Sequence, residues 1–543
     1  MEQIEDLLRR LEQLNEIGSA LSNERNTDAL LEKILLAAKA ITHADGGTLY
    51  CMDEAQEHLR FEILRTDSLG IAMGGTTGQP IVFPPLPLHL ADGTPNVSMV
   101  AAYSALKRQT VNIADAYRTE GFDFSGTRSF DARTGYRSTS FLTVPMMNHE
   151  GAVIGVLQLI NAVHPVTREV GVFSDSDRQL AESLASQAAI ALTNRQLLNQ
   201  LEALFESFIT LINNAIDEKS PYTGGHCQRV PTLTMMLAEA VNDTQHGPLA
   251  AFTMSDADRY ELKIAGLLHD CGKVTTPVHV VDKATKLQTI FDRIELIDTR
   301  FELIRRDIQM TVLQRRLAAG ETSAQAASGK IEGDDPDPLQ DLDADRAFLH
   351  HANVGSERMS DADMERVRAI ARRWNWTDSR GVLRACLSAE EVENLTIRAG
   401  TLTAGEREII NHHIVSTIRM LEALPWPRHL KNVPEYAGGH HERMDGKGYP
   451  RGLARHQMSV QARVMGIADI FEALTAKDRP YKQPMRLSEA LTILGKFSLN
   501  GHIDPDLFDV FVRQRVYLKY AETYLDPEQI DDVDFSGIPG FRP

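Results

Sequence analysis

The sequence predicts a multidomain protein in which a long helix connects an α/β (α+β) domain with an antiparallel sheet to an all-α domain. Three observations lead to this prediction. The chain has 543 residues, a length typical of roughly three domains. Between residues 46 and 162 apolar residues follow the period of strands, and elsewhere mostly that of helices. The segment from Ser174 to Ser220 contains neither glycine nor proline.

The N-terminal elements follow in order along the chain. Residues 2–23 place apolar side chains at helical spacing, and Asn26 or Thr27 is suited to cap a second helix. Four strands are predicted at residues 46–52, 59–65, 138–148 and 151–162, and the tight turn "NHEG" joins the last two as a hairpin. The segment 174–220 predicts one continuous, coiled-coil-like helix, with two helices that bend near Asn194 as the alternative.

Composition excludes several classes of protein. No run of about 18 apolar residues exists, so no membrane span is expected, and the charged start is unlike a secretory signal. The four cysteines, Cys51, Cys227, Cys271 and Cys386, stand far apart, which argues against a disulfide framework and favours the cytoplasm. The net charge of −18 argues against polymeric nucleic acid as the partner.

The stretches "TGYRSTSFLTVPMMNHEGAVIGVLQLINA" and "FSDSDRQLAESLASQAAIAL", with the helix and strands before them, resemble a GAF sensory domain over about residues 25–195. The resemblance implies a small-molecule ligand, a role in dimerisation, or both. Some GAF domains bind cyclic nucleotides through a signature of which this chain keeps Asn161, Phe173 and Asp177. Ala162 and Arg178 replace its Lys and Glu, so that signature is incomplete.

Most of the chain after Asp217 is predicted to be helical. Residues 288–400 stand apart as an insertion of charged helical pieces around an acidic, mobile loop, "SGKIEGDDPDPLQDLDADR". His350 and His351 lie within the insertion, but no other group there has ligand spacing. We therefore expect a surface or packing role for both.

Histidines and aspartates gather at five places in the helical part: His226, His269-Asp270, His412-His413, His440-His441 and Asp469. Each place lies in or beside a segment with an apolar face, so each can point into the interior of a helix bundle. One such histidine alone is more often a hydrogen-bonded packing residue. Five places without cysteine favour a site for iron, manganese, zinc or nickel.

Neighbouring residues on a helix lie about 100° apart around its axis, because a turn holds 3.6 residues. Adjacent His440 and His441 therefore cannot easily point at one ion, but each can hold one of two neighbouring ions. In the same way, His269 can bind one ion while the Asp270 carboxylate bridges both. Two metal ions about 3.5–4 Å apart clamp both oxygens of an in-line phosphoryl displacement.

An acidic chain that acts on an anion needs local cations, and the candidates are Lys273, Arg443, Arg479 and Lys482. Lys273 follows the His-Asp pair by about one helical turn. Gly446 and Gly448 permit positive φ and close backbone approach, and Tyr449 offers a ring for stacking. An ordinary tight turn between helices is the plain alternative for this loop.

The motifs "HDCGK", "HHERMDGKGYP" and "ADIFEALTAKDRPYK" resemble those of the HD-GYP family, a subgroup of the all-helical HD metal-dependent phosphohydrolases. The resemblance covers about residues 210–287 and 401–515 and includes "YTGGHCQRV" and "GHIDPDLFDVF". It implies hydrolysis of cyclic di-GMP to linear pGpG, and in some members to GMP. Asp270 and Lys273 are the implied catalytic residues. Lys273, Arg443, Tyr449, Arg479 and Lys482 are the expected contacts of the substrate.

Carried over by position, the resemblance implies seven metal ligands: His226, His269, Asp270, His413, His440, His441 and Asp469. They would hold two divalent ions, iron or manganese. His413 is preferred to His412 for its distance from the "LT" of "GTLTAGERE", and Ile414 stands where the family commonly has proline. Tyr222 replaces a glutamate that holds a third metal in some members, so a two-metal site is expected.

These observations predict a helix at 1–24, a GAF domain at 25–195, a connecting helix at 196–216, an HD-GYP domain at 217–530 and a tail at 531–543. A homodimer is expected. Two alternative functions stay open. One is a phosphodiesterase that prefers cyclic GMP-AMP, and the other is a non-catalytic signalling protein whose loop at 439–450 docks onto a diguanylate cyclase domain.

Overall fold

The computed structural model describes residues 2–24, 26–220, 225–318, 338–355, 358–477 and 484–541. The chain divides into two compact units, Met1–Phe205 and Glu206–Pro543. Within the described ranges, no helix combines the length and the apolar character needed to cross a bilayer.

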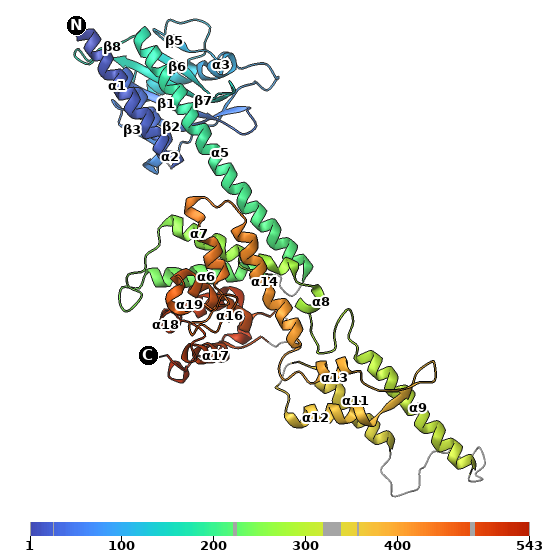
Figure 1. Cartoon of the computed structure of the whole chain (residues 1–543). Coiled ribbons are helices and arrows are strands. Elements are labelled where there is room, and N and C mark those ends of the chain that lie inside the picture. Colours follow the sequence, from blue (N-terminus) through green and yellow to red (C-terminus); the bar gives the residue numbers. More distant parts are fainter. Residues whose placement is uncertain are drawn as a thin grey trace. The chain divides into compact units, whose positions relative to one another are not determined.

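The first unit is built on an antiparallel sheet (Figure 1). Its strands are β1 (Ala44–Met52), β2 (His58–Thr66), β3 (Ile71–Gly74), β4 (Leu86–Pro87), β5 (Val111–Ile113), β6 (Phe141–Met147), β7 (Val153–Val163) and β8 (Val170–Gly171). Their order is β3-β2-β1-β7-β6-β5, with β4 beside β2 and β8 beside β7. The four predicted strands are the four central ones, and β6 and β7 form the predicted hairpin.

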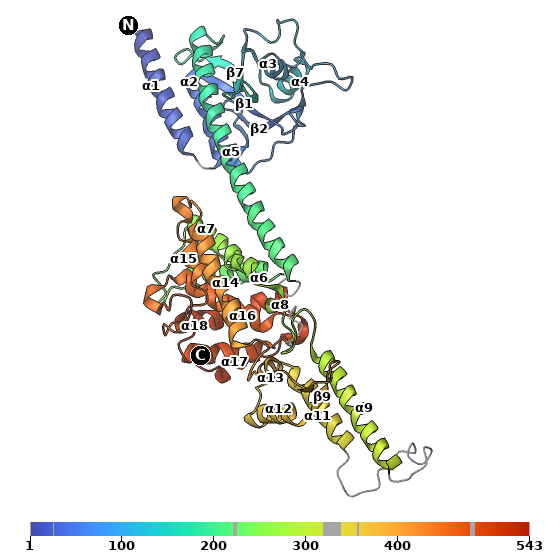
Figure 2. The same ribbon diagram turned by 45° about the vertical axis from the view of Figure 1, so that its right-hand side comes forward.

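Helices cover both faces of this sheet. On one face, α1 (Glu2–Asn23), α2 (Thr27–Thr42) and the start of α5 share a core with Leu49 and Leu157 (Figure 2). On the other, α3 (Val100–Lys107) packs with Tyr50 and Val156. The unit also contains η1 (Gly75–Thr77) and α4 (Ser125–Thr134). Asn26 caps α2 as predicted, because its side chain accepts a hydrogen bond of 2.9 Å from the Ala29 N–H.

Helix α5 (Asp175–Lys219) is a single helix of 45 residues, so the continuous helix is confirmed and the bend near Asn194 is excluded. It begins in the first unit and ends in the second. The absence of glycine and proline accounts for its length, because these two residues are the strongest interruptions of helices.

The second unit contains a helical bundle. Its elements are α6 (His226–Asn242), α7 (Asp256–Leu268), η2 (Cys271–Thr275), α8 (Val278–Val281), α14 (Ala404–Glu422), η3 (Arg428–Leu430), α15 (Val433–Gly438), η4 (Arg455–Gln457), α16 (Val460–Thr475), α17 (Leu487–Leu499), α18 (Pro505–Arg513), α19 (Val516–Tyr524), η5 (Pro527–Gln529) and η6 (Phe535–Gly537). Helix α6 packs against α7 and α16, and α14 packs against η2 and α15.

The insertion has a hydrophobic core of its own. Helices α9 (Ile294–Ala318), α11 (Pro338–Asn353), α12 (Asp361–Arg373) and α13 (Ala389–Leu395) enclose this core together with a hairpin of β9 (Asn375–Thr377) and β10 (Leu383–Ala385). Helices α9 and α11 lie side by side (Figure 2). His350 pairs with Asp298 at 2.9 Å and its side chain is 48% exposed, which agrees with the surface role, one of the two expected for it.

The expected mobile loop in the insertion needs correction over its second half. Residues 319–337 lie outside the described part of the chain, but residues 338–346 form the first turns of α11. Leu342 in this stretch is buried in the core of the insertion, and Pro338 occupies a position at the helix start that suits proline. The dense acidic residues concealed this helix, because only Leu339 and Leu342 mark its apolar side near the start.

Candidate metal centre

The structure brings all seven sequence-predicted ligands together from separate segments of the second unit. His226 begins α6, His269 and Asp270 join α7 to η2, His413 lies in α14, His440 and His441 follow α15, and Asp469 lies in α16. Two groups have donor atoms within 4.8 Å of one another, His226 with His269 and Asp270, and His413 with His440 and His441. His412, by contrast, is exposed.

The first group is centred on Nε2 of His226. This nitrogen lies 3.4 Å from Nε2 of His269, 3.0 Å from Oδ2 of Asp270 and 3.4 Å from Oδ1 of Asp469. The side chains of His226, His269 and Asp270 are almost fully buried, and Asp469 is 14% exposed. Two imidazoles and two carboxylates therefore face one point.

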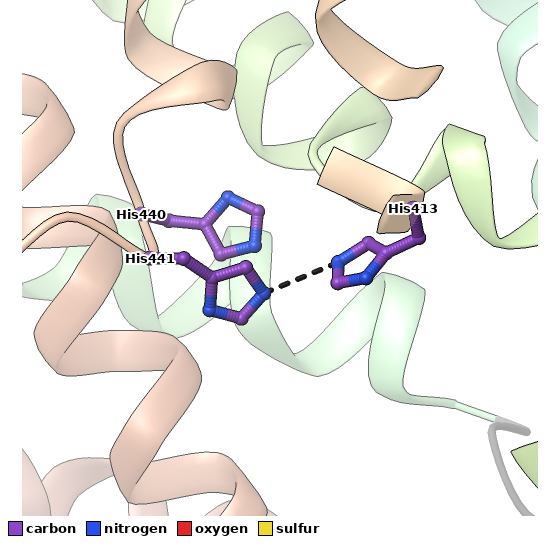
Figure 3. A group of neighbouring side chains, drawn as sticks. All are labelled: His413, His440 and His441. Carbon is purple, nitrogen blue, oxygen red and sulfur yellow. Dashed lines mark hydrogen bonds between the residues drawn. The ribbon is translucent and has the colours of Figure 1, made fainter. Parts of the chain in front are cut away.

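The second group consists of three histidines that face one another (Figure 3). Nε2 of His441 lies 3.1 Å from Nε2 of His413. The His440 ring also lies near the first group, with its centroid 4.1 Å from that of His441 and 5.0 Å from that of His269. Adjacent His440 and His441 both belong to the group with His413. Their assignment to two different ions stays a prediction.

The Asp270 carboxylate connects the groups. Its Oδ2 lies beside His226 and His269, and its Oδ1 lies 3.2 Å from Nε2 of His413. Ligands bonded to one ion at about 2.1 Å are separated by roughly 3.0–3.4 Å in tetrahedral or octahedral arrangements. The observed separations of 3.0 to 3.4 Å between donor atoms match this spacing.

The Nδ1 atoms of three histidines donate to backbone carbonyls three residues earlier in the chain. The pairs are His269 with Gly266 at 2.7 Å, His440 with Ala437 at 2.7 Å, and His413 with Ile410. Each bond fixes the tautomer and turns the Nε2 lone pair toward the centre, the arrangement found in metal-bound histidines.

With these tautomers, hydrogen-bond acceptor atoms of neighbouring ligands face one another. The Nε2 lone pair of His413 faces Oδ1 of Asp270, and this oxygen has no hydrogen-bond partner within the described residues. Nε2 of His440 is likewise buried without a partner there. Burial and the neighbouring His269 lower the pKa of His440 to about 4, so this imidazole is neutral at pH 7. Buried acceptors that face one another require a cation between them, so these residues fit a metal site.

His226 is oriented by a carboxylate outside the predicted set. Its Nδ1 donates to Oε2 of Glu472 at 2.6 Å, and Glu472 in turn accepts a hydrogen bond of 2.8 Å from Nε of Arg229. Burial opposes protonation of His226, but the charges of Glu472 and Asp270 outweigh it and raise the pKa of His226 to about 9. The position beside Asp270 therefore attracts positive charge, from a proton or from a metal ion.

Two glycines allow the close approaches on which the centre depends. A Cβ at Gly272 would lie 2.0 Å from the carbonyl oxygen of His413, so only glycine lets η2 lie directly on α14. A Cβ at Gly448 would lie 2.4 Å from the backbone nitrogen of Arg443. Gly446 instead supplies positive φ, at 74°. The sequence predicted positive φ and close backbone approach for the loop glycines. Gly446 has the positive φ, and Gly448 makes the close approach.

Two sets of contacts hold the loop at 439–450 in place. The Tyr449 ring stacks on His441 with centroids 4.8 Å apart. The buried Glu442 carboxylate accepts hydrogen bonds from the backbone N–H groups of Arg451 at 2.7 Å and Leu453 at 2.8 Å. Together these contacts hold the loop in a fixed shape against His441.

The predicted substrate contacts lie in different places. Nζ of Lys273 lies 2.5 Å from Oδ2 of Asp270, at the centre. Burial opposes the charge of Lys273, but Asp270 and Asp469 raise its pKa, so the ammonium is retained. Arg443 pairs with Asp445 in the loop instead of a ligand carboxylate. Arg479 and Lys482, like Tyr222, lie outside the described residues.

Sequence reasoning missed Glu472, Arg229 and Glu442, which orient the ligands and the loop. A signal existed for the first two. Glu472 follows Asp469 by three residues on α16, and Arg229 follows His226 by three residues on α6, so each lies one helical turn from a ligand. Nothing in the local sequence of Glu442 indicated that its carboxylate is buried under the loop.

Comparison with known families agrees with this architecture. Residues 26–192 match the GAF domain family. Residues 223–357 and residues 388–507 each match an HD domain family. The first of these HD matches extends into the insertion.

Several characterised relatives share parts of the chain. A 3′3′-cGAMP-specific phosphodiesterase of Vibrio cholerae is 47% identical over 94 residues, 17% of this chain and 22% of that protein. A cyclic di-GMP phosphodiesterase of Pseudomonas aeruginosa is 38% identical over 116 residues, 21% of this chain and 27% of that protein. Another 3′3′-cGAMP-specific phosphodiesterase of Vibrio cholerae is 24% identical over 307 residues, 56% of this chain and 38% of that protein. The matched regions thus cover well under half of the length of these relatives.

Among solved structures, the GAF domain of an Acinetobacter phosphoenolpyruvate-protein phosphotransferase aligns with 35% of this chain and 95% of that domain. It has 16% identity and a TM-score of 0.26. Residues 122 to 287 of a methyl-accepting chemotaxis protein align with 34% of this chain and 98% of that structure, with 22% identity and a TM-score of 0.25. With TM-scores this low, neither alignment supports an inference about a property of this chain.

Proposed function

We propose that this chain, which carries a GAF domain followed by an HD domain, is a metal-dependent phosphodiesterase that hydrolyses cyclic di-GMP. The observation that carries the proposal is the Asp270 carboxylate, which faces His226 and His269 through one oxygen and His413 through the other. A carboxylate that faces histidines on both sides could help to hold a pair of divalent ions, which would supply two-metal catalysis of phosphodiester hydrolysis.

His226, His269, Asp270, His413, His440, His441 and Asp469 would hold the ions, which we propose to be iron or manganese. When bound, such a pair supplies Lewis acidity and neutralises charge at the reacting phosphate. The all-imidazole and carboxylate donor set suits these metals.

The reaction adds water across one phosphodiester bond. A water oxygen forms a bond to phosphorus, the bond from phosphorus to the 3′ oxygen breaks, and that oxygen takes up a proton. The product is linear pGpG, and repetition at the second phosphodiester gives GMP. Lys273 is retained as an ammonium beside Asp270, where we propose that it binds a phosphate oxygen as charge develops in the transition state.

The test is turnover of cyclic di-GMP by the full chain loaded with Fe²⁺ or Mn²⁺, with the products separated by chromatography. We expect pGpG to appear with the intact chain and to be absent with His269→Ala. Purified, metal-loaded protein that leaves cyclic di-GMP unchanged contradicts the proposal.

Cyclic GMP-AMP is the second candidate substrate, because two of the characterised relatives described above are 3′3′-cGAMP-specific phosphodiesterases. The two substrates share the phosphodiester ring and differ in one base. Parallel measurements of kcat/KM for both substrates decide between them. Docking to a cyclase domain through the loop at 439–450 stays a prediction.

A cavity in the first unit supports a sensory role. It has a volume of about 430 Å³ and is lined by aromatic side chains, including Tyr50, Phe61 and Phe124, with Arg133 and Tyr136 among the polar groups. This mixture suits a small organic ligand.

The free, mostly buried cysteines fit a reducing cytoplasm.

Helix α5 supports a homodimer. Apolar side chains recur along it with alternating spacings of four and three residues, at Leu197, Leu201, Leu204, Phe208 and Leu211, and all are more than 50% exposed. This spacing is the heptad seam of a coiled coil, in which identical helices cover one another's apolar stripes. A second copy of the chain is therefore the proposed partner.

A further inference from the structure

The last turn of α5 contacts the segment that carries Lys273. Nζ of Lys219, the final residue of α5, donates to the backbone carbonyl of Lys273 at 3.3 Å and to that of Val274. Both carbonyls belong to η2, the short helix that directly follows Asp270. A charged donor shared between two carbonyls is a strong anchor, because hydrogen bonds with an ionised partner are about twice as strong as neutral ones.

Helix η2 is also held by α14. The Gly272 N–H donates to Oγ1 of Thr417 at 2.9 Å, and the missing side chain of Gly272 allows contact with the His413 carbonyl. Lys219 and α14 together therefore fix the backbone of η2. The position of this backbone decides where the Lys273 ammonium lies relative to Asp270.

Two more contacts connect the end of α5 with the same region. An oxygen of Asp217 accepts a hydrogen bond of 3.4 Å from the N–H of Gly225, the residue before ligand His226. Ser220 donates to Asp282, at the end of α8. The last turn of α5 thus touches the backbone next to the first ligand and the backbone of η2.

From these contacts we infer that Lys219 is a positioning residue, which sets the position of Lys273. A displacement of α5 would therefore move Lys273 through Lys219. This inference rests on the proposed function, since it assumes that Lys273 binds the substrate. It goes beyond that function by naming the residue through which a signal carried along α5 reaches the chemistry. Lys219 itself touches no ligand of the proposed metals.

The experiment compares full-length Lys219→Met and Lys219→Arg with a matched control, Lys263→Met. Lys263 also contacts α5, through an exposed ion pair of 3.2 Å with Glu206, but it does not touch η2. We expect Lys219→Met to lower kcat about tenfold with unchanged bound metal. Lys219→Arg retains a charged donor and should restore most of the rate, and Lys263→Met should match the wild type.

A double-mutant cycle separates positioning from general stabilisation. If Lys219 acts through Lys273, adding Lys219→Met to Lys273→Met costs less than about twofold more. A tenfold further loss in the Lys273→Met background shows that Lys219 acts elsewhere and overturns the inference.

Amide hydrogen exchange gives a reading that does not depend on activity. Exchange over residues 271–276 should be faster in Lys219→Met than in the wild type and unchanged in Lys263→Met. Equal protection of this segment in all three proteins overturns the inference. A wild-type chain that cleaves no cyclic dinucleotide overturns the proposed function instead, and the exchange comparison still decides whether Lys219 anchors η2.

Discussion

Oδ1 of Asp270 lies 3.2 Å from Nε2 of His413, although 142 residues separate the two in the chain. Helix η2 and α14 make this approach possible because Gly272 lies directly on the backbone of α14. The other oxygen of Asp270 faces His226 and His269. Asp270 is therefore the residue on which both halves of the proposed centre depend.

We predict that Asp270→Asn lowers turnover more than about a hundredfold and reduces bound metal, because the amide removes the negative charge and replaces one of the two oxygens that face the two groups of histidines. Metal analysis and kcat measured on the same preparation check this. His350→Ala is the control, since His350 pairs with Asp298 in the insertion. Full metal content and turnover in Asp270→Asn contradict the bridging role.

Glu472→Gln should weaken metal binding about tenfold to a hundredfold, because Glu472 orients His226 and increases its basicity. Competition with a chelator measures the affinity. Glu422→Gln provides the control, as Glu422 forms an exposed ion pair with Arg451. If both variants bind metal as the wild type does, Glu472 does not support the ligand.

Gly448→Ala should destabilise the loop by about 1–3 kcal/mol and lower turnover, because the new methyl group would meet backbone atoms of Glu442 and Arg443 at 2.4 to 2.6 Å. Urea unfolding and kcat test both effects. Gly405→Ala in the first turn of α14 has open space around the added Cβ and should be neutral or slightly stabilising. Equal stability of the two variants argues against the close approach.

The insertion should lose stability in acid through Glu391. Burial disfavours its charge, but the Arg300 guanidinium and the Ser388 hydrogen bonds lower the pKa of Glu391 below its ordinary value. The folded pKa lies below the unfolded one, so this stabilisation is complete above the unfolded pKa of about 4.3 and is lost as pH falls through the folded pKa. Glu391→Gln should therefore cost about 2 kcal/mol near neutral pH and progressively less in acid.

Urea unfolding of both proteins at neutral and acidic pH measures this difference. Glu390→Gln is the control, because the Glu390 side chain is 66% exposed and its charge is therefore well solvated. A gap between wild type and Glu391→Gln that stays constant with pH shows that the lost carboxylate charge is not the cause.

Leu204→Asp should convert the proposed dimer into a monomer, because it places a charge in the middle of the apolar seam of α5. Light scattering coupled to gel filtration measures the mass. Asn199→Asp adds the same charge on the same helix at an outer heptad position and should leave the dimer intact. A wild-type chain that is monomeric at all concentrations rules out the dimer.

The sequence was most informative where residue type alone limits the chemistry. Histidine and aspartate at five places indicated a metal centre because few other roles require so many of them. Likewise, α5 was predictable because a long segment without glycine or proline has few alternatives to one helix. In both cases the prediction depended only on which residue types are present and how they are spaced. No knowledge of packing was needed.

The features that could not be predicted from the sequence depend on packing between distant segments. Glu442 resembles an ordinary surface carboxylate in the sequence, and its partners come from the folded arrangement. Glu472 lies one helical turn from Asp469, but its partner His226 belongs to a distant segment. The hairpin of β9 and β10 was missed because its strands have three residues each. The separate core of the insertion likewise arises from contacts between α9 and helices that begin at residue 338 or later.

Metal stoichiometry tests the central claim most directly. Metal-free protein titrated anaerobically with Fe²⁺ or Mn²⁺ should bind two ions per chain, and His226→Ala and His413→Ala should each lose tight binding of at least one. Binding of no ion, or of a single ion that neither substitution affects, contradicts the two-metal centre and the function proposed from it.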